Sequence, residues 1–387
     1  MSAPVDAPVA AGMSAGFTYE ALPMRVVFGV GASERVDQEL DALGYDRVLV
    51  LCTPEQTAVA SSISDALGAR SVGVHPGARM HVPVESADAA VDLARERGAD
   101  ACLAVGGGST TGLGKAVALR HHLPVVAVPT TYAGSEMTPI WGLTEGGTKT
   151  TGRDSAVLPR AVVYDPLLTL GLPVDLSVTS GLNAVAHAVE GLWAPNASPI
   201  TSLMAAEGVR ALLAALPRVV AAPDDVDARS EALRGAWLCG AVLGATTMSL
   251  HHKLCHVLGG SWDLPHAAVH AAVLPHVLAF NAPAAPAAVA ALTPALGLGS
   301  AGAGSVSGDA HGGSSAPDVA GALWDLARAL GAPTSLADVG LPADAVDEVV
   351  SRVLAAPYAN PRPVKADALA ALLRAAVAGT RPVTAAP

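Results

Sequence analysis

The first 165 residues of the chain alternate short apolar runs with longer stretches that have helical spacing. The apolar runs are almost continuous in valine, leucine and alanine, as is typical of strands buried on both faces of a parallel sheet. The stretches between them, such as SERVDQELDAL, begin with polar residues and then follow a helical period. This alternation predicts an α/β domain with a doubly wound, mostly parallel sheet. The predicted strands cover 25–29, 47–52, 71–75, 101–108, 124–131 and 160–166.

The pattern changes after residue 166, where strand signals disappear and long stretches with helical periodicity follow. We therefore expect a nucleotide-binding α/β domain over 17–166 and an all-α domain over 167–387. Residues 296–316 are rich in glycine and serine and almost free of charge, which predicts a flexible surface loop. Residues 1–16 are expected to form a disordered tail.

Composition narrows the class of protein. The net charge is -11 and aromatic residues make up only 3% of the chain, so neither a basic footprint nor aromatic stacking platforms favour nucleic-acid binding. The four cysteines have no CxxC spacing, which is typical of a reduced, cytoplasmic protein. Prolines interrupt the longest apolar tract, around 279–304, and the first residues lack a basic region, so we expect neither a membrane span nor a signal peptide.

A glycine-rich stretch, VGGGSTTGLGK, follows a predicted buried strand and precedes a helical stretch. Glycines allow close approach to a phosphate, and the start of a helix offers N–H groups and a positive dipole end. The stretch is neither GxGxxG nor a P-loop, so a plain strand–helix turn is the alternative. Ligands of open sheets gather at the carboxyl ends of strands, which favours cofactor phosphate binding here. The candidate residues are Gly106, Gly107, Gly108 and Ser109.

Hydroxyl-bearing residues follow the next predicted strand, within 128–154. Thr130, Thr131 and Ser135 are expected beside the nucleotide, because adjacent strand ends meet at one edge of the sheet. The sequence TEGGTKTTG predicts a hairpin turn that brings Lys149 to the same face. The alternative is a polar connection whose hydroxyls are incidental.

Histidines cluster in the second half of the chain, where six of the twelve lie between residues 251 and 276. His252 and His256 are four apart and share a helical face, and His266 follows behind a proline. Asn183 and His187 are also four apart on another predicted helix. A solvated, histidine-rich helix end and polar pairs inside a helical bundle are the plain alternatives.

Three imidazoles and a carboxylate are a common catalytic metal set, but the fourth position here would be the neutral Asn183. The affinity for a divalent metal ion should therefore be lower than at a site with a carboxylate. The same histidines, with Lys253, can instead form a cationic site that binds an anion or an oxyanion.

The segments AVGGGSTTGLGKA, PTTYAGSEMTPIWGLTEGG, TSGLNAVAHAVEGLW, LHHKLCHVLGG and LPHAAVHAAVLPH, in this order, resemble the iron-containing alcohol dehydrogenase superfamily. Within it they look most like the maleylacetate reductases. The resemblance implies a dehydroquinate synthase-like architecture in which a catalytic helical domain follows the nucleotide-binding domain and the active site lies between them. It also implies a homodimer.

The resemblance assigns roles to individual positions. In metal-dependent relatives the positions of Asn183, His187, His252 and His266 hold the metal, with an aspartate at the first, and His256 matches a further cleft histidine. Maleylacetate reductases are similar to this chain in having asparagine there, so we expect no metal. The resemblance implies reduction of the C=C bond of maleylacetate, a small dicarboxylate enone, to 3-oxoadipate during the degradation of aromatic compounds.

The expected roles follow from that chemistry. His252 and Lys253 would contact an oxyanion or carboxylate, and a nearby histidine or Tyr132 would supply the proton. His251, Arg153 and Arg362 are further cationic candidates.

Glu55, after the second predicted strand, would accept a hydrogen bond from a ribose hydroxyl, which favours NADH over NADPH. The alternatives are a metal-dependent alcohol dehydrogenase, a reductase of a related enone in biosynthesis, and a regulatory protein that binds nucleotide without turnover.

Overall fold

The computed structural model describes residues 16–146, 148–298 and 317–384. The predicted tail over 1–16 lies outside the described residues except for Gly16, and the predicted loop over 296–316 lies outside them except for residues 296–298. Both expectations therefore stay predictions.

Six strands form one parallel sheet in the order β1-β8-β5-β4-β2-β3. Each of the six predicted apolar runs contains one of these strands, so the parallel α/β arrangement is confirmed. The strands are β1 (Arg25–Phe28), β2 (Val48–Leu51), β3 (Ser71–His75), β4 (Ala101–Gly106), β5 (Val125–Pro129) and β8 (Ala161–Tyr164).

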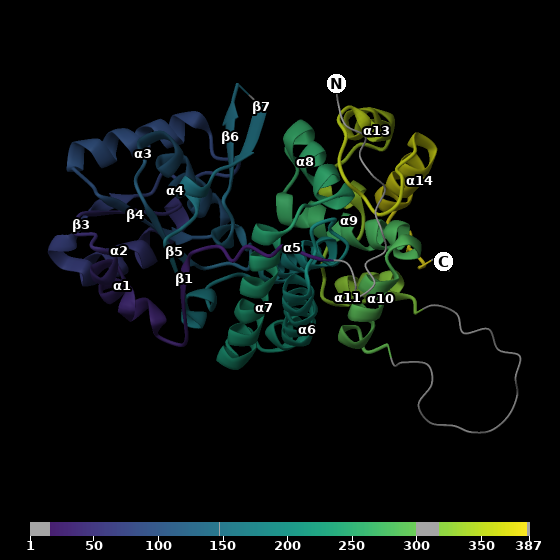
Figure 1. The fold of residues 1–387 in the computed structure, drawn as a ribbon, viewed down its shortest axis with the longest axis horizontal. Helices are drawn as coiled ribbons and strands as arrows, with labels where there is room; N and C mark the ends of the chain where they lie inside the picture. Colours follow the sequence, from purple (N-terminus) through teal and green to yellow (C-terminus); the bar gives the residue numbers. More distant parts are fainter. Residues whose placement is uncertain (1–15, 147, 299–316, 385–387) are drawn as a thin grey trace, which may run out of the picture.

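Helices cover both faces of the sheet (Figure 1). The pleat explains why, because alternate residues of β2 point to opposite faces. Val48 and Val50 pack in the cluster formed with α1 (Val36–Leu43) and α2 (Thr57–Leu67). Leu49 and Leu51 pack in the cluster formed with α3 (Val84–Arg97) and α4 (Gly108–His121). A strand that is apolar on both sides can only be stable in the middle of such a sandwich.

Between β5 and β8 the chain leaves the sheet and forms an antiparallel hairpin of β6 (Ile140–Glu145) and β7 (Thr148–Arg153). Figure 1 shows this hairpin at the end of the sheet domain that faces α8 (Leu250–Trp262). The hairpin was predicted from its glycine-containing turn, and its position next to the helical part bears on the site described below.

The rest of the described chain is helical, which confirms the all-α second part. Its helices besides α8 are α5 (Val174–Leu192), α6 (Pro199–Ala221), α7 (Val226–Ala245), α9 (His266–Asn281), α10 (Pro286–Ala295), α11 (Val319–Ala329), α12 (Leu336–Val339), α13 (Val346–Leu354) and α14 (Ala366–Val377).

Helix α9 lies at the centre of the helical part. Leu274 and Leu278 belong to the core shared with α5, α6 and α7, whereas Val269 and Val273 belong to the core shared with α8, α13 and α14. Among the described residues, this stretch (His266–Ala284) is the one helix whose length and composition would suit a membrane span, and 72% of it is buried inside the protein. A helix that is apolar on all sides is expected at the centre of a helical bundle.

Candidate active site

The predicted phosphate-binding loop lies where β4 meets α4. Gly106 has a φ of 154°, and a Cβ added there would come within 2.5 Å of the Gln56 side-chain oxygen. A Cβ on Gly107 would lie 2.8 Å from Cγ2 of Thr131. At both positions a side chain would collide with neighbouring protein atoms, so only glycine fits in this loop, here called the glycine cradle, directly at the N-terminus of α4. This is the geometry that a pyrophosphate group needs.

Two buried polar atoms beside this cradle have no partner among the described residues: Oε1 of Gln56 and Oγ1 of Thr110. Buried polar atoms are normally paired, so both atoms indicate a ligand or water at this edge. The amide nitrogen of Gln56 donates to Oγ1 of Thr130 at 2.5 Å, which fixes one predicted residue. Neither Gln56 nor Thr110 was predicted, although both lie within the motifs that were. The cradle thus fits a dinucleotide.

The remaining predicted cofactor residues surround this edge. Gly108, Ser109, Thr131 and Ser135 are half-buried, and Glu55 is exposed after β2. The Ser135 carbonyl accepts a 2.6 Å hydrogen bond from the buried Lys115 ammonium, which also donates to the Ile140 carbonyl at 2.8 Å. Burial lowers the pKa of Lys115 to about 7, against the attraction of Glu136. Lys115 therefore ties the segment carrying Ser135 to the base of the hairpin.

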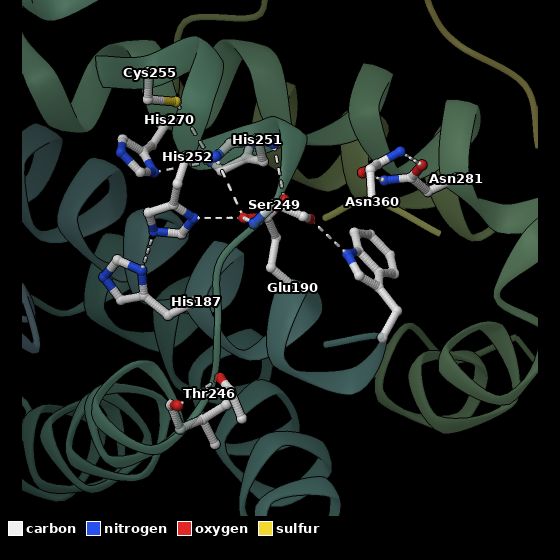
Figure 2. Close-up of polar contacts among 12 residues, drawn as sticks. His187, Glu190, Thr246, Ser249, His251, His252, Cys255, His270, Asn281 and Asn360 are labelled. Atoms are coloured by element: carbon white, nitrogen blue, oxygen red, sulfur yellow. Dashed lines mark hydrogen bonds and ion pairs between the residues drawn. The ribbon is translucent and has the colours of Figure 1, made fainter. Parts of the chain in front are cut away.

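Three helices bring the histidines together: α5 supplies His187, α8 supplies His251, His252 and His256, and α9 supplies His266 and His270. Nδ1 of His187 lies 2.8 Å from Nε2 of His252 (Figure 2). Nε2 of His187 lies 3.2 Å from the Ala133 carbonyl. Ala133 belongs to the loop after β5, so His187 also connects the helical part with the sheet domain.

Glu190 anchors this cluster. It lies fully buried on α5, and its carboxylate accepts from the backbone N–H groups of Ser249 at 2.9 Å and His251 at 2.8 Å. It also accepts from the hydroxyl of Ser249. The carboxylate therefore satisfies the free N–H groups at the start of α8, where a negative charge is also favoured by the helix dipole. Oε2 of the Glu190 carboxylate also lies 2.7 Å from Nδ1 of His252 (Figure 2).

The hydrogen bonds assign the protons in this chain of groups. A carbonyl can only accept, so His187 carries its proton on Nε2 and accepts at Nδ1 from Nε2–H of His252. Burial, followed by the charge of His252, holds the pKa of His187 well below its usual range, which agrees with a neutral ring. Burial favours the neutral form of Glu190, but hydrogen bonds and charge from His252 outweigh it and lower its pKa to about 2. Both ring nitrogens of His252 face acceptors, Nδ1 toward Glu190 and Nε2 toward His187, so the hydrogen-bond pattern places a proton on each of them.

A second imidazole pair lies beside the first. Nε2 of His251 is 2.9 Å from Nδ1 of His270, and Sγ of Cys255 is 3.6 Å from Nε2 of His251. Their outer nitrogens, Nδ1 of His251 and Nε2 of His270, are buried and have no partner in the part of the chain that the structure describes. Burial lowers the pKa of His251 to about 3, with a further contribution from the charge of His252. This second pair is therefore neutral.

Two of the predicted histidines are accessible to solvent. His256 is exposed and His266 is half-buried, and their rings are stacked with centroids 6.5 Å apart. Burial among surrounding protein atoms nevertheless lowers the pKa of His256 to about 3. The His256 ring is therefore accessible to solvent although protein atoms surround it closely, as is expected of a side chain in a recess of the surface. Lys253 is half-buried on the same helix.

The other predicted residues are placed differently. Tyr132 is fully buried, and its hydroxyl lies 3.3 Å from Nη1 of the buried Arg229, away from the histidine rings. Arg153 donates to the Gly244 carbonyl, and Arg362 donates to the Phe280 carbonyl at 3.1 Å. The structure does not bring these three side chains to the histidine cluster. Arg229 and Glu190 were not predicted. Glu190 lies seven residues after Asn183 and three after His187, a helical spacing that was the available signal.

The four positions that would hold a metal in relatives do not fit one here. Both ring nitrogens of His187 and both of His252 are already used in hydrogen bonds, and Asn183 offers only a neutral oxygen, which is buried without a partner. Among the described residues one group of three donors lies close together, formed by His251, Cys255 and His270. Ligands of one tetrahedral zinc ion stand about 3.3 to 3.6 Å apart. The 2.9 Å between the two imidazoles is shorter than that and is a hydrogen-bond distance.

Comparison with known proteins identifies the family. The family model "Iron-containing alcohol dehydrogenase" matches residues 23–166, and "Fe-containing alcohol dehydrogenase family, C-terminal" matches residues 177–377. Maleylacetate reductases of Burkholderia cepacia and Sphingobium indicum are each 52% identical, over 95% of this chain and 99% of theirs. The crystal structure of maleylacetate reductase from Agrobacterium tumefaciens is 49% identical, with a TM-score of 0.87 over 95% of this chain and 100% of that one.

Proposed function

We propose that this chain, which belongs to the iron-containing alcohol dehydrogenase family, is a maleylacetate reductase of aromatic degradation that converts maleylacetate to 3-oxoadipate with NAD(P)H. The observation that carries the proposal is the 52% identity to two maleylacetate reductases over nearly the whole of each chain. The side chains of the site support the proposal. A glycine cradle suited to a nucleotide lies beside a cationic histidine cluster, and the histidine nitrogens that would bind a metal are used in hydrogen bonds.

A nicotinamide cofactor held at the glycine cradle would supply a hydride to the alkene carbon β to the ketone. Negative charge then develops on the ketone oxygen as an enolate, and the α-carbon takes a proton. His256 and His266 are the histidines accessible to solvent, so they donate hydrogen bonds to the substrate. The negative charge of the bound substrate raises the pKa of these rings, so one of them can take a proton from solvent and pass it to the α-carbon. His252 cannot do so directly, because Glu190 and His187 occupy both of its N–H groups.

The imidazolium of His252 stabilises the enolate at a distance. It lies one ring behind His187 in a buried, low-dielectric region, where a fixed positive charge acts more strongly than in water. It is preorganised, since Glu190 and His187 hold it in place before substrate arrives. This arrangement supports metal-independent turnover, in which the histidine cation supplies the positive charge.

The cofactor preference is part of the proposal. Glu55 is exposed after β2, where it can accept from a ribose hydroxyl and would repel a 2′-phosphate, so NADH is preferred. Hydrogen bonds from its own backbone N–H and from Thr53, followed by the charge of Arg79, lower the pKa of Glu55, so its carboxylate is ionised. Steady-state rates with NADH and NADPH under identical conditions test the preference. A homodimer and a cytoplasmic location stay predictions, and light scattering of the purified protein tests the first.

The direct test is NADH oxidation by the purified chain with maleylacetate, followed by identification of 3-oxoadipate as the product. We expect rapid turnover with maleylacetate and little with simple alcohols and NAD⁺. Faster turnover of another enone would identify the biosynthetic alternative. Binding of NADH without turnover of any enone or alcohol would identify a regulatory protein and would refute the proposal.

A further inference from the structure

We propose that Lys149 and His81 of the sheet domain form a carboxylate-binding subsite opposite His266, and that this subsite selects dicarboxylate over monocarboxylate enones. The inference rests on the proposed function and moves Lys149 from the cofactor to the substrate. It rests on the contacts that join three segments: the β6–β7 hairpin, the loop before α3 and the turn before α9.

The hairpin sets the direction of the Lys149 side chain. Lys149 on β7 is paired with Thr144 on β6, so the two side chains lie on one face of the hairpin. A Cβ added to Gly142, two residues before Thr144, would lie 3.2 Å from Cε of Lys149. The lysine stem therefore lies across Gly142, toward the base of the hairpin, where Lys115 holds the Ile140 carbonyl next to the cofactor edge.

The same face of the hairpin holds the loop that carries His81. The hydroxyl of Thr144 donates to the His81 carbonyl at 2.8 Å, and its backbone N–H donates to the Val82 carbonyl at 3.1 Å. His81 and Val82 have φ values of 62° and 48°, a conformation that such residues adopt only when neighbours enforce it. The loop is thus held rigidly against the hairpin, with His81 near Lys149.

His81 reaches across to the helical part. Its Nε2 lies 3.3 Å from Oδ1 of Asp263, which is in the turn between α8 and α9, three residues before His266. The Asp263 side chain is largely exposed, whereas the His81 side chain is mostly buried. The ring of His81 therefore approaches the His266 end of the cluster from the opposite side of the cleft.

Lys149 has no acidic partner among the described residues: it makes no ion pair or side-chain hydrogen bond there. Burial lowers the pKa of Lys149. A half-buried lysine without a counter-ion, facing two imidazoles, is a site that a carboxylate would complete. A substrate with two carboxylates needs such a partner in addition to the donors on α8 and α9.

The test compares Lys149→Met with wild type on three substrates: maleylacetate and the two monoanionic enones that each lack one of its carboxylates, 4-oxopent-2-enoate and 3-oxopent-4-enoate. We expect kcat/KM for maleylacetate to fall about 10- to 100-fold, as for loss of one charge-assisted hydrogen bond. The loss should appear mainly in KM and should vanish for the monoanion that lacks the carboxylate bound by Lys149. Lys149→Arg should retain most of the activity, and Lys365→Met, at an exposed lysine on the helical part, is the matched control.

Three outcomes overturn the subsite: an unchanged kcat/KM for maleylacetate, equal losses on all three substrates, or a loss explained by weaker NADH binding in fluorescence titration. Each of these presupposes that wild type reduces maleylacetate. If wild type does not, the proposed function fails first, so the two failures are distinguishable.

Discussion

Two imidazole pairs lie side by side in this protein and differ in one respect. His187–His252 and His251–His270 are separated by 2.8 and 2.9 Å, and the adjacent residues 251 and 252 of α8 contribute one ring to each (Figure 2). The first pair ends on the Ala133 carbonyl and the Glu190 carboxylate. The second pair ends on two buried nitrogens without partners.

The difference teaches where a positive charge can persist in a buried histidine cluster. Burial opposes the charged form of every ring, so only a ring with a carboxylate beside it stays protonated. Glu190 provides that carboxylate to His252 alone. One acidic side chain therefore decides which of several neighbouring histidines is the cation.

The largest effect should come from removing Glu190. Glu190→Ala deletes the acceptor of the α8 N-terminal N–H groups and leaves His252 without its counter-charge, so we expect unfolding free energy to fall by about 3 to 5 kcal/mol. Glu190→Gln preserves the shape and should fold, but His252 would lose its proton and turnover should fall by about 100-fold. Denaturant unfolding and kcat measure the two effects, with the exposed Glu145→Gln as control. A Glu190→Gln enzyme with wild-type kcat would contradict the role of the carboxylate.

The next effect separates the two pairs directly. His252→Asn should lower kcat by about 100-fold, because it removes the cation that stabilises the enolate. His251→Asn, one residue earlier on α8, should cost about 1 to 3 kcal/mol of stability through a lost buried hydrogen bond, with kcat within about fivefold of wild type. Steady-state kinetics and thermal unfolding of the two variants decide the matter. Equal losses of kcat would show that the pairs act as one unit.

A smaller effect is the pH dependence of stability. Burial lowers the pKa of His251 to about 3 and that of His276 to about 4, from about 6.5 in the unfolded chain. Between pH 6.5 and 4 the unfolded state therefore binds more protons than the native state, and stability falls as pH falls. Each histidine contributes about 1.4 kcal/mol per pH unit well inside that window.

Unfolding midpoints measured from pH 7.5 to 5 test this slope. His276→Gln should make the slope shallower, whereas the exposed His122→Gln should leave it unchanged. A stability that is flat across this range would contradict the neutral state of the buried histidines.

The fold was largely predictable from the sequence because it follows from local patterns. Runs such as those around β2 and β4 are apolar on both faces, which leaves a strand little choice except the middle of a covered parallel sheet. The glycine cradle was predictable for the same reason, since its position after a strand and before a helix places it at the ligand-binding edge.

The chemistry of the histidine cluster was only partly predictable. Spacing placed Asn183 with His187 and His252 with His256, but the bond between Glu190 and the start of α8 joins residues about 60 positions apart. Sequence spacing says nothing about such a contact, nor about which nitrogen of each ring is protonated. Tyr132 illustrates the same limit, because its hydroxyl lies at Arg229 and that arginine is brought there by α7.

The most direct test of a histidine cation in place of a metal is the rate of maleylacetate reduction as a function of bound metal. Protein samples are prepared with and without chelation, their iron and zinc contents are measured, and kcat is determined with NADH for each. We expect the same kcat whether metal is absent or present, because His252 supplies the charge. A kcat that rises in proportion to bound iron or zinc and disappears on chelation would contradict this account.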